Sequence, residues 1–289
     1  MTVWQRWPVW LALIGIGACA RSGQRDAARE LPPLALAATP ASDGPGQVRG
    51  LWLWTRGDLP VFESSRRRLP ELEAGVFIAD FECPKGALAL RRGLSPLTAG
   101  VSPRALVVRF SDSMQACFAQ LDSDALAKSL DKRFTRLLDE VNDTGVHFRE
   151  LQIDYDAPVS KLADYARLLG YLRAHSLRGV DLWITSIPVH LQQPGYGAAL
   201  RGIVTGHIIQ VFDTGLICSA EEAERLHAAV RAQPLPYRIG YGAFERAGAA
   251  PELSHRCWQS RTTLWRADPE FAGIWLFPAG IGDDAAVLP

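Results

Sequence analysis

The sequence lacks several features that would assign it to a common functional class. Its 31 Lys and Arg residues balance 31 Asp and Glu residues, so no basic excess indicates nucleic acid as a partner. It contains no glycine-rich phosphate loop, no His-Glu-x-x-His sequence and no Cys-x-x-Cys pair. His190 and His207 have no second His or Cys at metal-ligand spacing. We therefore expect neither a nucleotide cofactor nor a bound metal.

Long apolar runs are also scarce near the N-terminus. Residues 7–18 are apolar, but the run is shorter than the ~20 residues that a membrane-spanning helix needs. With Arg6 before it, the run fits the core of a signal peptide. The following Ile16-Gly17-Ala18-Cys19 resembles the bacterial lipobox. We predict a signal peptide over residues 1–18 and lipidation of Cys19; an ordinary signal peptide or a short anchor helix is the alternative.

Residues 19–48 are rich in Ala, Pro, Gly and Ser and have no apolar periodicity, which is typical of a flexible tether. Ala20 and Arg21, rather than Asp, follow Cys19, as in enterobacterial outer-membrane lipoproteins, which this sequence resembles in that respect. We expect a lipid-anchored protein of the bacterial cell envelope, on the outer membrane and facing the periplasm. Residues 49–289 then form one domain of a size common for α/β barrels.

Eight short apolar segments recur through that domain, as expected for strands buried on both faces of a parallel sheet. They are residues 51–54, 75–81, 105–110, 151–155, 182–187, 207–212, 237–241 and 273–277. Helical periodicity marks residues 125–141 and 161–175 and the segment after Ser219, but is weak after the first, second and seventh strands. This alternation predicts a (β/α)8 TIM-type barrel; an open doubly wound sheet is the alternative.

The most informative segment is the fourth predicted strand with its extension, residues 150–158. Strand side chains alternate, so Gln152, Asp154 and Asp156 share one face, which in a barrel is the interior. Charges there are tolerated at the C-terminal rim, where barrel active sites lie. Carboxylates about 7 Å apart would repel and raise one pKa toward neutrality. The alternative is a structural role, capping a helix or binding an arginine inside the barrel.

The strands together resemble a bacterial family described only as domain of unknown function 3142, and more distantly the chitinase-like family 18 glycoside hydrolases. The family 18 signature is Asp-x-Asp-x-Glu, whose Glu protonates the glycosidic oxygen. Residues 152–156 match its spacing, with Gln152 replacing the first Asp and Asp156 replacing the Glu. The resemblance implies that Asp156 is a general acid, assisted by Asp154, and that Gln152 contacts substrate.

Residues 210–213 resemble the Met-x-Tyr-Asp of that family's sixth strand, which implies that Gln210 and Asp213 bind substrate. Two positions depart from the family. Asp156 is one methylene shorter than Glu, and a displacement of about 1 Å can cost a hundredfold in rate. Phe212 lacks the Tyr hydroxyl that orients a substrate acetamido group.

Further rim candidates come from the ends of other predicted strands. Aromatic side chains there are expected either to stack on sugar rings or to pack in the core. These are Trp52, Trp54, Tyr241 and Trp275. Glu82 and Arg109 are further candidates for substrate binding, with a structural ion pair between Arg109 and Asp80 or Glu82 as the alternative.

Four cysteines remain beyond Cys19. An even number in an oxidising compartment suggests two disulfides with three possible pairings, or else four buried thiols. In a barrel, Cys83 and Cys117 follow the second and third strands, and Cys218 and Cys257 follow the sixth and seventh. Neighbouring loops can bring Cα atoms within about 7 Å, so we predict the pairs Cys83–Cys117 and Cys218–Cys257.

Two functional hypotheses follow from these features. One is a glycoside-hydrolase-like envelope lipoprotein that acts on a polysaccharide or glycan through Asp156 and Asp154. The other is a barrel without catalysis that binds a glycan or an envelope partner. The altered motif favours the second, and the retained pair of carboxylates favours the first.

Overall fold

The computed structural model describes residues 48–96, 100–244 and 255–278, and its centre is a closed barrel of eight parallel strands. Each strand pairs with the next, and β1 closes the ring by pairing with both β2 and β9. The barrel strands are β1 Val48–Leu53, β2 Glu73–Glu82, β4 Pro103–Phe110, β5 Glu150–Asp154, β6 Asp181–Ser186, β7 Gly206–Gln210, β8 Tyr237–Gly242 and β9 Phe271–Phe277. All eight predicted strands and the (β/α)8 barrel are confirmed.

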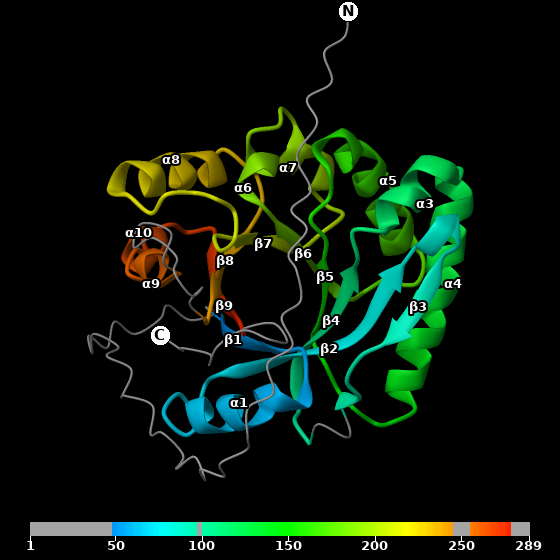
Figure 1. The fold of residues 1–289 in the computed structure, drawn as a ribbon, viewed down its shortest axis with the longest axis horizontal. Coiled ribbons are helices and arrows are strands. Elements are labelled where there is room, and N and C mark those ends of the chain that lie inside the picture. The colour runs from blue at the N-terminus through cyan, green and yellow to red at the C-terminus, as the bar shows by residue number, and fades with distance from the viewer. Residues whose placement is uncertain (1–47, 97–99, 245–254, 279–289) are drawn as a thin grey trace, which may run out of the picture. The chain divides into compact units, whose positions relative to one another are not determined.

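Helices surround the ring of strands (Figure 1). They are α1 Leu59–Arg66, α3 Met114–Gln120, α4 Ser123–Asn142, α5 Leu162–Ala174, α6 Pro188–Leu191, α7 Tyr196–Leu200, α8 Ala220–Arg231, α9 His255–Gln259 and α10 Thr262–Arg266. The three strongly predicted helices correspond to α4, α5 and α8. Among the described residues, no helix is long and apolar enough to cross a membrane.

The longest helix, α4, forms where its apolar spacing predicts it. Leu126, Leu130 and Phe134 repeat on one face and are buried against the barrel. The Asp122 carboxylate caps the helix by accepting hydrogen bonds from the backbone N–H groups of residues 124 and 125. In the same way, the Ser219 hydroxyl accepts from the N–H of Glu222 at the start of α8.

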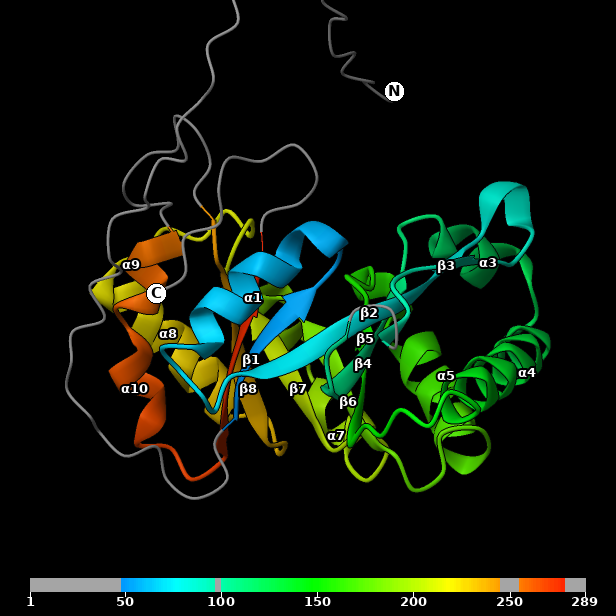
Figure 2. The same ribbon diagram turned by 90° about the horizontal axis from the view of Figure 1, so that it is seen from below.

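The second strand is followed not by a helix but by an antiparallel strand, β3 Ala89–Arg92, which pairs with the end of β2. In Figures 1 and 2, β3 lies beside α3 and α4. Arg133 of α4 donates a hydrogen bond to the Leu88 carbonyl oxygen, which fixes the helix against this hairpin. The weak helical periodicity after the second strand is thus explained by a hairpin.

Inside the barrel, large aromatic side chains form a core separate from the layer between strands and helices. The interior cluster consists of Trp52, Phe77, Ala105, Val107, Trp183, Ile208, Trp275 and Phe277. Trp275 fits because its neighbours on β1 and β2 are glycines. A Cβ at Gly50 would lie 2.4 Å from its ring, and one at Gly75 would lie 2.7 Å away. The predicted signal peptide, Cys19 and the tether before residue 48 lie outside the described residues.

Candidate functional site

The interior face of β5 carries three polar side chains at three heights in the barrel. Glu150 lies at the N-terminal end, which we call the base, and Asp154 lies at the C-terminal end, which we call the mouth. Between them Gln152 is fully buried; its carbonyl oxygen accepts from Trp52 Nε1 at 2.6 Å, and its amide donates to Glu150 at 3.3 Å. The predicted role of Gln152 in substrate contact is therefore corrected, because the barrel interior covers it.

At the base, Glu150 is closely paired. Its carboxylate accepts two hydrogen bonds from Arg238, at 2.6 and 2.8 Å, and one from Arg104 at 2.8 Å. Burial disfavours the charge of Glu150, but Arg238 and Arg104 outweigh that effect and lower its pKa. The Arg238 guanidinium also lies over the Trp183 ring, 3.6 Å from its centroid. The base of the barrel is therefore occupied by a carboxylate whose charge is balanced by the two arginines.

At the mouth, Asp154 and Asp156 line one pocket of about 560 Å³. Asp154 ends β5 and accepts a hydrogen bond from Gln210 Nε2 at 3.1 Å, while Asp156 lies just beyond the strand and is exposed. The lining residues are Trp54, Asp154, Asp156, Ile187, Pro188, Val189, Gln192, Gln210, Phe212, Asp213, Thr214, Leu216, Phe244, Phe277 and Pro278. Five predicted site residues thus come together: Trp54, Asp154, Asp156, Gln210 and Asp213.

Both pocket carboxylates have raised pKa values. Burial, reinforced by the charge of Asp156, raises the pKa of Asp154 to about 7, against hydrogen bonds from Thr185 and Gln210 and the charge of Arg109. Partial desolvation and then the charge of Asp112 raise the pKa of Asp156. The sequence predicts one acid near neutrality; the structure places the larger shift on Asp154 because it lies deeper.

Neither Arg109 nor Glu82 lines the pocket. Arg109 is paired with the buried Asp80, which also binds Arg91 at 2.7 Å, and Arg91 in turn holds Glu82 at 3.1 Å. The structural ion pair considered for Arg109 is therefore present. Arg109 still reaches the pocket wall, because its guanidinium lies 5.8 Å from the Trp54 ring centroid.

Three predicted stacking residues lie away from the pocket. Trp52 is fully buried in the barrel interior. Tyr241 points to the helix layer, where it is 1% exposed and its hydroxyl accepts from Thr262 at 3.1 Å. Trp275 is fully buried low in the barrel, level with Gly50. The expectation that they stack on sugar rings is corrected: strand alternation directs Tyr241 outward, and Trp52 and Trp275 are buried beneath the mouth.

The pocket also contains residues that the sequence did not single out. Phe277 lies on the same strand face as Trp275, two residues nearer the mouth, so alternation alone indicates it. Residues 187–189 follow β6 and form one wall. Nothing in their apolar composition marks a site, because only the fold brings them beside β5.

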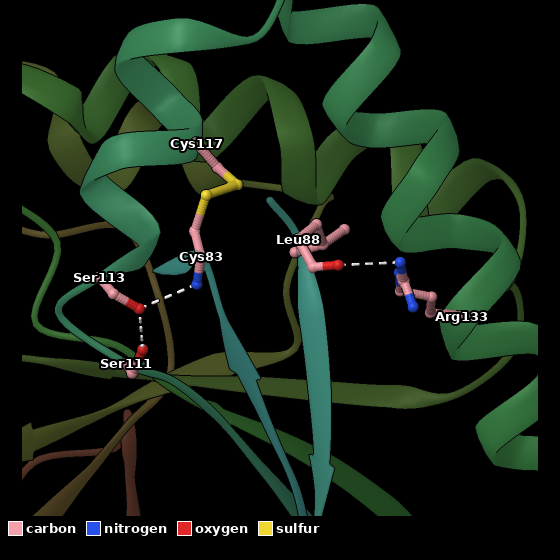
Figure 3. Close-up of a disulfide and its surroundings, with 6 residues drawn as sticks. All are labelled: Cys83, Leu88, Ser111, Ser113, Cys117 and Arg133. Carbon is pink, nitrogen blue, oxygen red and sulfur yellow. Dashed lines mark hydrogen bonds between the residues drawn. A yellow bond between two sulfur atoms is a disulfide. The ribbon is translucent and has the colours of Figure 1, made fainter. Parts of the chain in front are cut away.

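Two disulfides hold mouth loops together. Cys83 pairs with Cys117 and Cys218 with Cys257, with Cα atoms 5.8 and 6.0 Å apart, as neighbouring loops lead one to expect. Figure 3 shows the first disulfide beside the Ser113 hydroxyl, which accepts from the Cys83 N–H at 2.9 Å. Among the residues that the structure describes, no three His, Cys, Asp or Glu side chains come together as a metal site.

The sequence profile of a domain of unknown function, DUF3142, matches residues 102–247, which include β5 and most of the pocket. The chain belongs to the DUF3142 family. No curated protein matches it in sequence. Only a comparison of the fold with solved structures therefore tests the expected relation of this family to glycoside hydrolases.

Three solved structures with a similar fold are, by title, a spore cortex-lytic enzyme and two chitinases. The spore cortex-lytic enzyme SleL of Bacillus cereus has a TM-score of 0.54 at 13% identity, over 82% of this chain and 72% of that one. A chitinase of Chromobacterium violaceum gives 0.51 at 13% identity, over 82% and 96%. The chitinase ChiB of Flavobacterium johnsoniae gives 0.53 at 13%, over 80% and 87%. This DUF3142 chain therefore has a glycoside-hydrolase-like fold.

Proposed function

We propose that this DUF3142 protein cleaves a polysaccharide or glycan in the mouth pocket, with Asp156 as the proton donor and Asp154 as its half-buried partner. The observation that carries the proposal is the pair of carboxylates with raised pKa values in one pocket. The pKa of Asp154 is raised to about 7, and the raised pKa of Asp156 favours the protonated form that a general acid requires. Trp54 and Phe277 supply apolar walls against which a sugar ring can pack.

The division of roles follows from exposure. Asp156 is exposed at the rim and can reach a glycosidic oxygen, whereas Asp154 is held by Gln210 below it. Coupled carboxylates titrate as a pair. A protonated Asp154 therefore stabilises the carboxylate that Asp156 becomes after donating its proton, or passes a proton back to it. Hydrolysis then breaks the bond between the anomeric carbon and the leaving oxygen. The proton of Asp156 goes to that oxygen, water supplies hydroxyl to the carbon, and the remaining proton of that water returns to the carboxylate pair.

A glycan-binding module without catalysis is the second candidate, and the chemistry of one wall favours it. Phe212 lines the pocket with no hydroxyl to orient a substrate group, and the donor at position 156 has the shorter of the two acidic side chains. The pocket and its aromatic walls serve binding equally well. Both candidate functions predict that the pocket binds a glycan, and only the first predicts that the glycan is cleaved.

The decisive experiment is a screen of the purified full chain against envelope and extracellular polysaccharides, with both binding and product release measured. Asp156→Asn should lower turnover by about 10²–10⁴-fold while the protein stays folded. Asp143→Asn, an exposed carboxylate at the base, is the matched control and should have no effect. Affinity without turnover in any variant assigns the binding role, and the absence of both refutes the proposal.

We further propose that Cys19 carries a lipid that anchors the protein to the envelope, on the outer membrane and facing the periplasm. Support comes from the residue pattern at 16–19 and from two disulfides, which persist in oxidising compartments. Cys19→Ala should release the protein from the membrane fraction. A wild-type protein with no lipid mass on Cys19 would refute the anchor.

A further inference from the structure

The residue proposed as the acid sits in a sharp turn that is held from outside its own strand. The Ala157 N–H donates to the Tyr155 carbonyl oxygen at 2.9 Å, so Asp156 is the middle residue of a three-residue turn. The Tyr155 N–H donates to Thr185 Oγ1 at 2.9 Å, and the Ala157 carbonyl oxygen lies 2.7 Å from His190 Nε2. Both ends of the turn are therefore held by the β6–α6 segment.

The hydrogen bonds of His190 fix its tautomer. The Ile187 N–H donates to Nδ1 at 3.3 Å, so Nδ1 is the acceptor, and Nε2 must carry the proton that it donates to Ala157. Only the neutral ring satisfies both partners. Protonation of Nδ1 would set two donors against each other and break the bond to Ile187.

The surroundings of His190 keep it neutral. The ring is 1% exposed, and burial lowers its pKa. Tyr196 of α7, with ring centroids 5.5 Å apart, and the buried His207 of β7 both face it. Neither is a carboxylate that would stabilise a charged ring. Acid therefore acts on this residue by breaking its bond to the Ile187 N–H, and repulsion between the two donors then displaces the ring from Ala157.

We propose that His190 is a positioning residue, which holds the Asp156 turn over the pocket and couples it to the pocket wall. The wall residues Ile187, Pro188 and Val189 belong to the same short segment as His190. A ligand that packs on this wall therefore contacts the segment that positions the Asp156 turn. The catalytic consequence rests on the proposed function. The positioning itself depends only on the contacts of His190.

Hydrogen exchange measured on the full chain tests the positioning without any substrate. His190→Phe removes the donor, so the amides of residues 155 and 157 should exchange at least about tenfold faster, while the rest of the barrel keeps its protection. In His190→Gln the amide still donates to Ala157, and protection should return. His147→Gln, an exposed histidine at the base, is the matched control. Unchanged exchange at 155 and 157 in a folded His190→Phe protein overturns the proposal.

Acid titration separates positioning from general stability and serves if His190→Phe does not fold. As the pH falls through the pKa of His190, wild-type protection at residues 155–157 should be lost before global unfolding, and His190→Gln should not show this step. Identical pH profiles overturn the proposal. Where a glycan is cleaved, His190→Phe should lower kcat more than it changes KM. Loss of local protection with no glycan turnover in any protein refutes the proposed function and leaves the positioning role intact.

Discussion

Glu150 and Asp154 lie on the same face of the same strand, yet their surroundings shift their pKa values in opposite directions. At the base, Glu150 faces Arg238 and Arg104, which lower its pKa despite burial. At the mouth, burial of Asp154 prevails over Thr185, Gln210 and Arg109 and raises its pKa to about 7. Only three residues lie between a carboxylate that is paired with cations and one that faces a pocket.

This contrast separates a structural end of the barrel from a functional one. A neutralised charge network can be packed and left without solvent access, as at Glu150, but it offers no group for chemistry. A buried carboxyl group without a matching cation costs stability when ionised, and it persists where function requires a proton near neutral pH. Substitutions that change one end of the barrel at a time should separate these two roles.

The largest effect is expected at the base. Glu150→Gln leaves Arg238 buried, at 3% exposure, without its carboxylate, and removing one partner of such a pair costs about 3–5 kcal/mol. Denaturant unfolding at pH 7 measures the loss. The control is Glu73→Gln, because Glu73 is partly exposed and pairs with Arg104 at 3.5 Å; its loss should cost less than about 1 kcal/mol. Equal effects of the two variants would contradict a matched network at Glu150.

At the mouth, removal of the carboxylate charge should raise the free energy of unfolding instead of lowering it. Because folding raises the pKa of Asp154, the protein is most stable while this group is protonated and loses stability as the pH rises from about 4 to about 7. Asp154→Asn keeps an oxygen for Gln210 and removes the charge. Its free energy of unfolding should match wild type below pH 4 and exceed it by up to about 4 kcal/mol at pH 8, because a shift of about three pKa units corresponds to about 1.4 kcal/mol per unit.

Stability curves of both proteins across pH 3–9 check this expectation. Asp143→Asn, on the exposed base, should follow wild type throughout. A variant that is less stable than wild type at pH 8 would mean that ionised Asp154 is a structural partner, as in the alternative considered for this pair.

The middle of β5 should give an intermediate loss. Gln152→Leu removes the oxygen that accepts from Trp52 Nε1 and leaves that N–H buried without a partner. An unsatisfied buried donor costs about 1–3 kcal/mol. The expected signature is a lower midpoint of denaturation with unchanged glycan binding, because Gln152 does not line the pocket. A change in binding at unchanged stability would restore the substrate role that the sequence suggested.

The barrel was predictable because its signals are local. Each strand is a short apolar run, and the α4 periodicity and Asp122 cap lie within consecutive residues. The pair Asp154 and Asp156 was predictable for the same reason, since strand alternation and the mouth position follow from neighbouring residues. The residues that surround this pair in the pocket were not predictable, because they depend on which strands become neighbours in the barrel.

His190 shows this limit clearly. In sequence it is an isolated histidine with no metal spacing, and its contact with Ala157 spans 33 residues. Trp275 shows the converse: its place at a strand end suggested a rim residue, but height in the barrel is set by register with β1, where Gly50 makes room for it. The depth of a side chain follows from strand register, which a single sequence does not specify.

The smallest effects should come from the neighbours of Asp154, and their signs should differ. The charge of Arg109 favours ionised Asp154, so Arg109→Gln should raise the pKa of Asp154 above about 7, by less than about one unit because Arg109 is partly exposed. Asp80 keeps Arg91 as a partner in this variant, so the fold should survive. Asp156→Asn removes a negative neighbour and should lower the same pKa. Carboxyl ¹³C titration by NMR, with Asp154→Asn to assign the signal, measures both shifts. Shifts of equal sign would show that the two substitutions act through a change in burial, and that direct charge interactions do not set the proton affinity of the mouth.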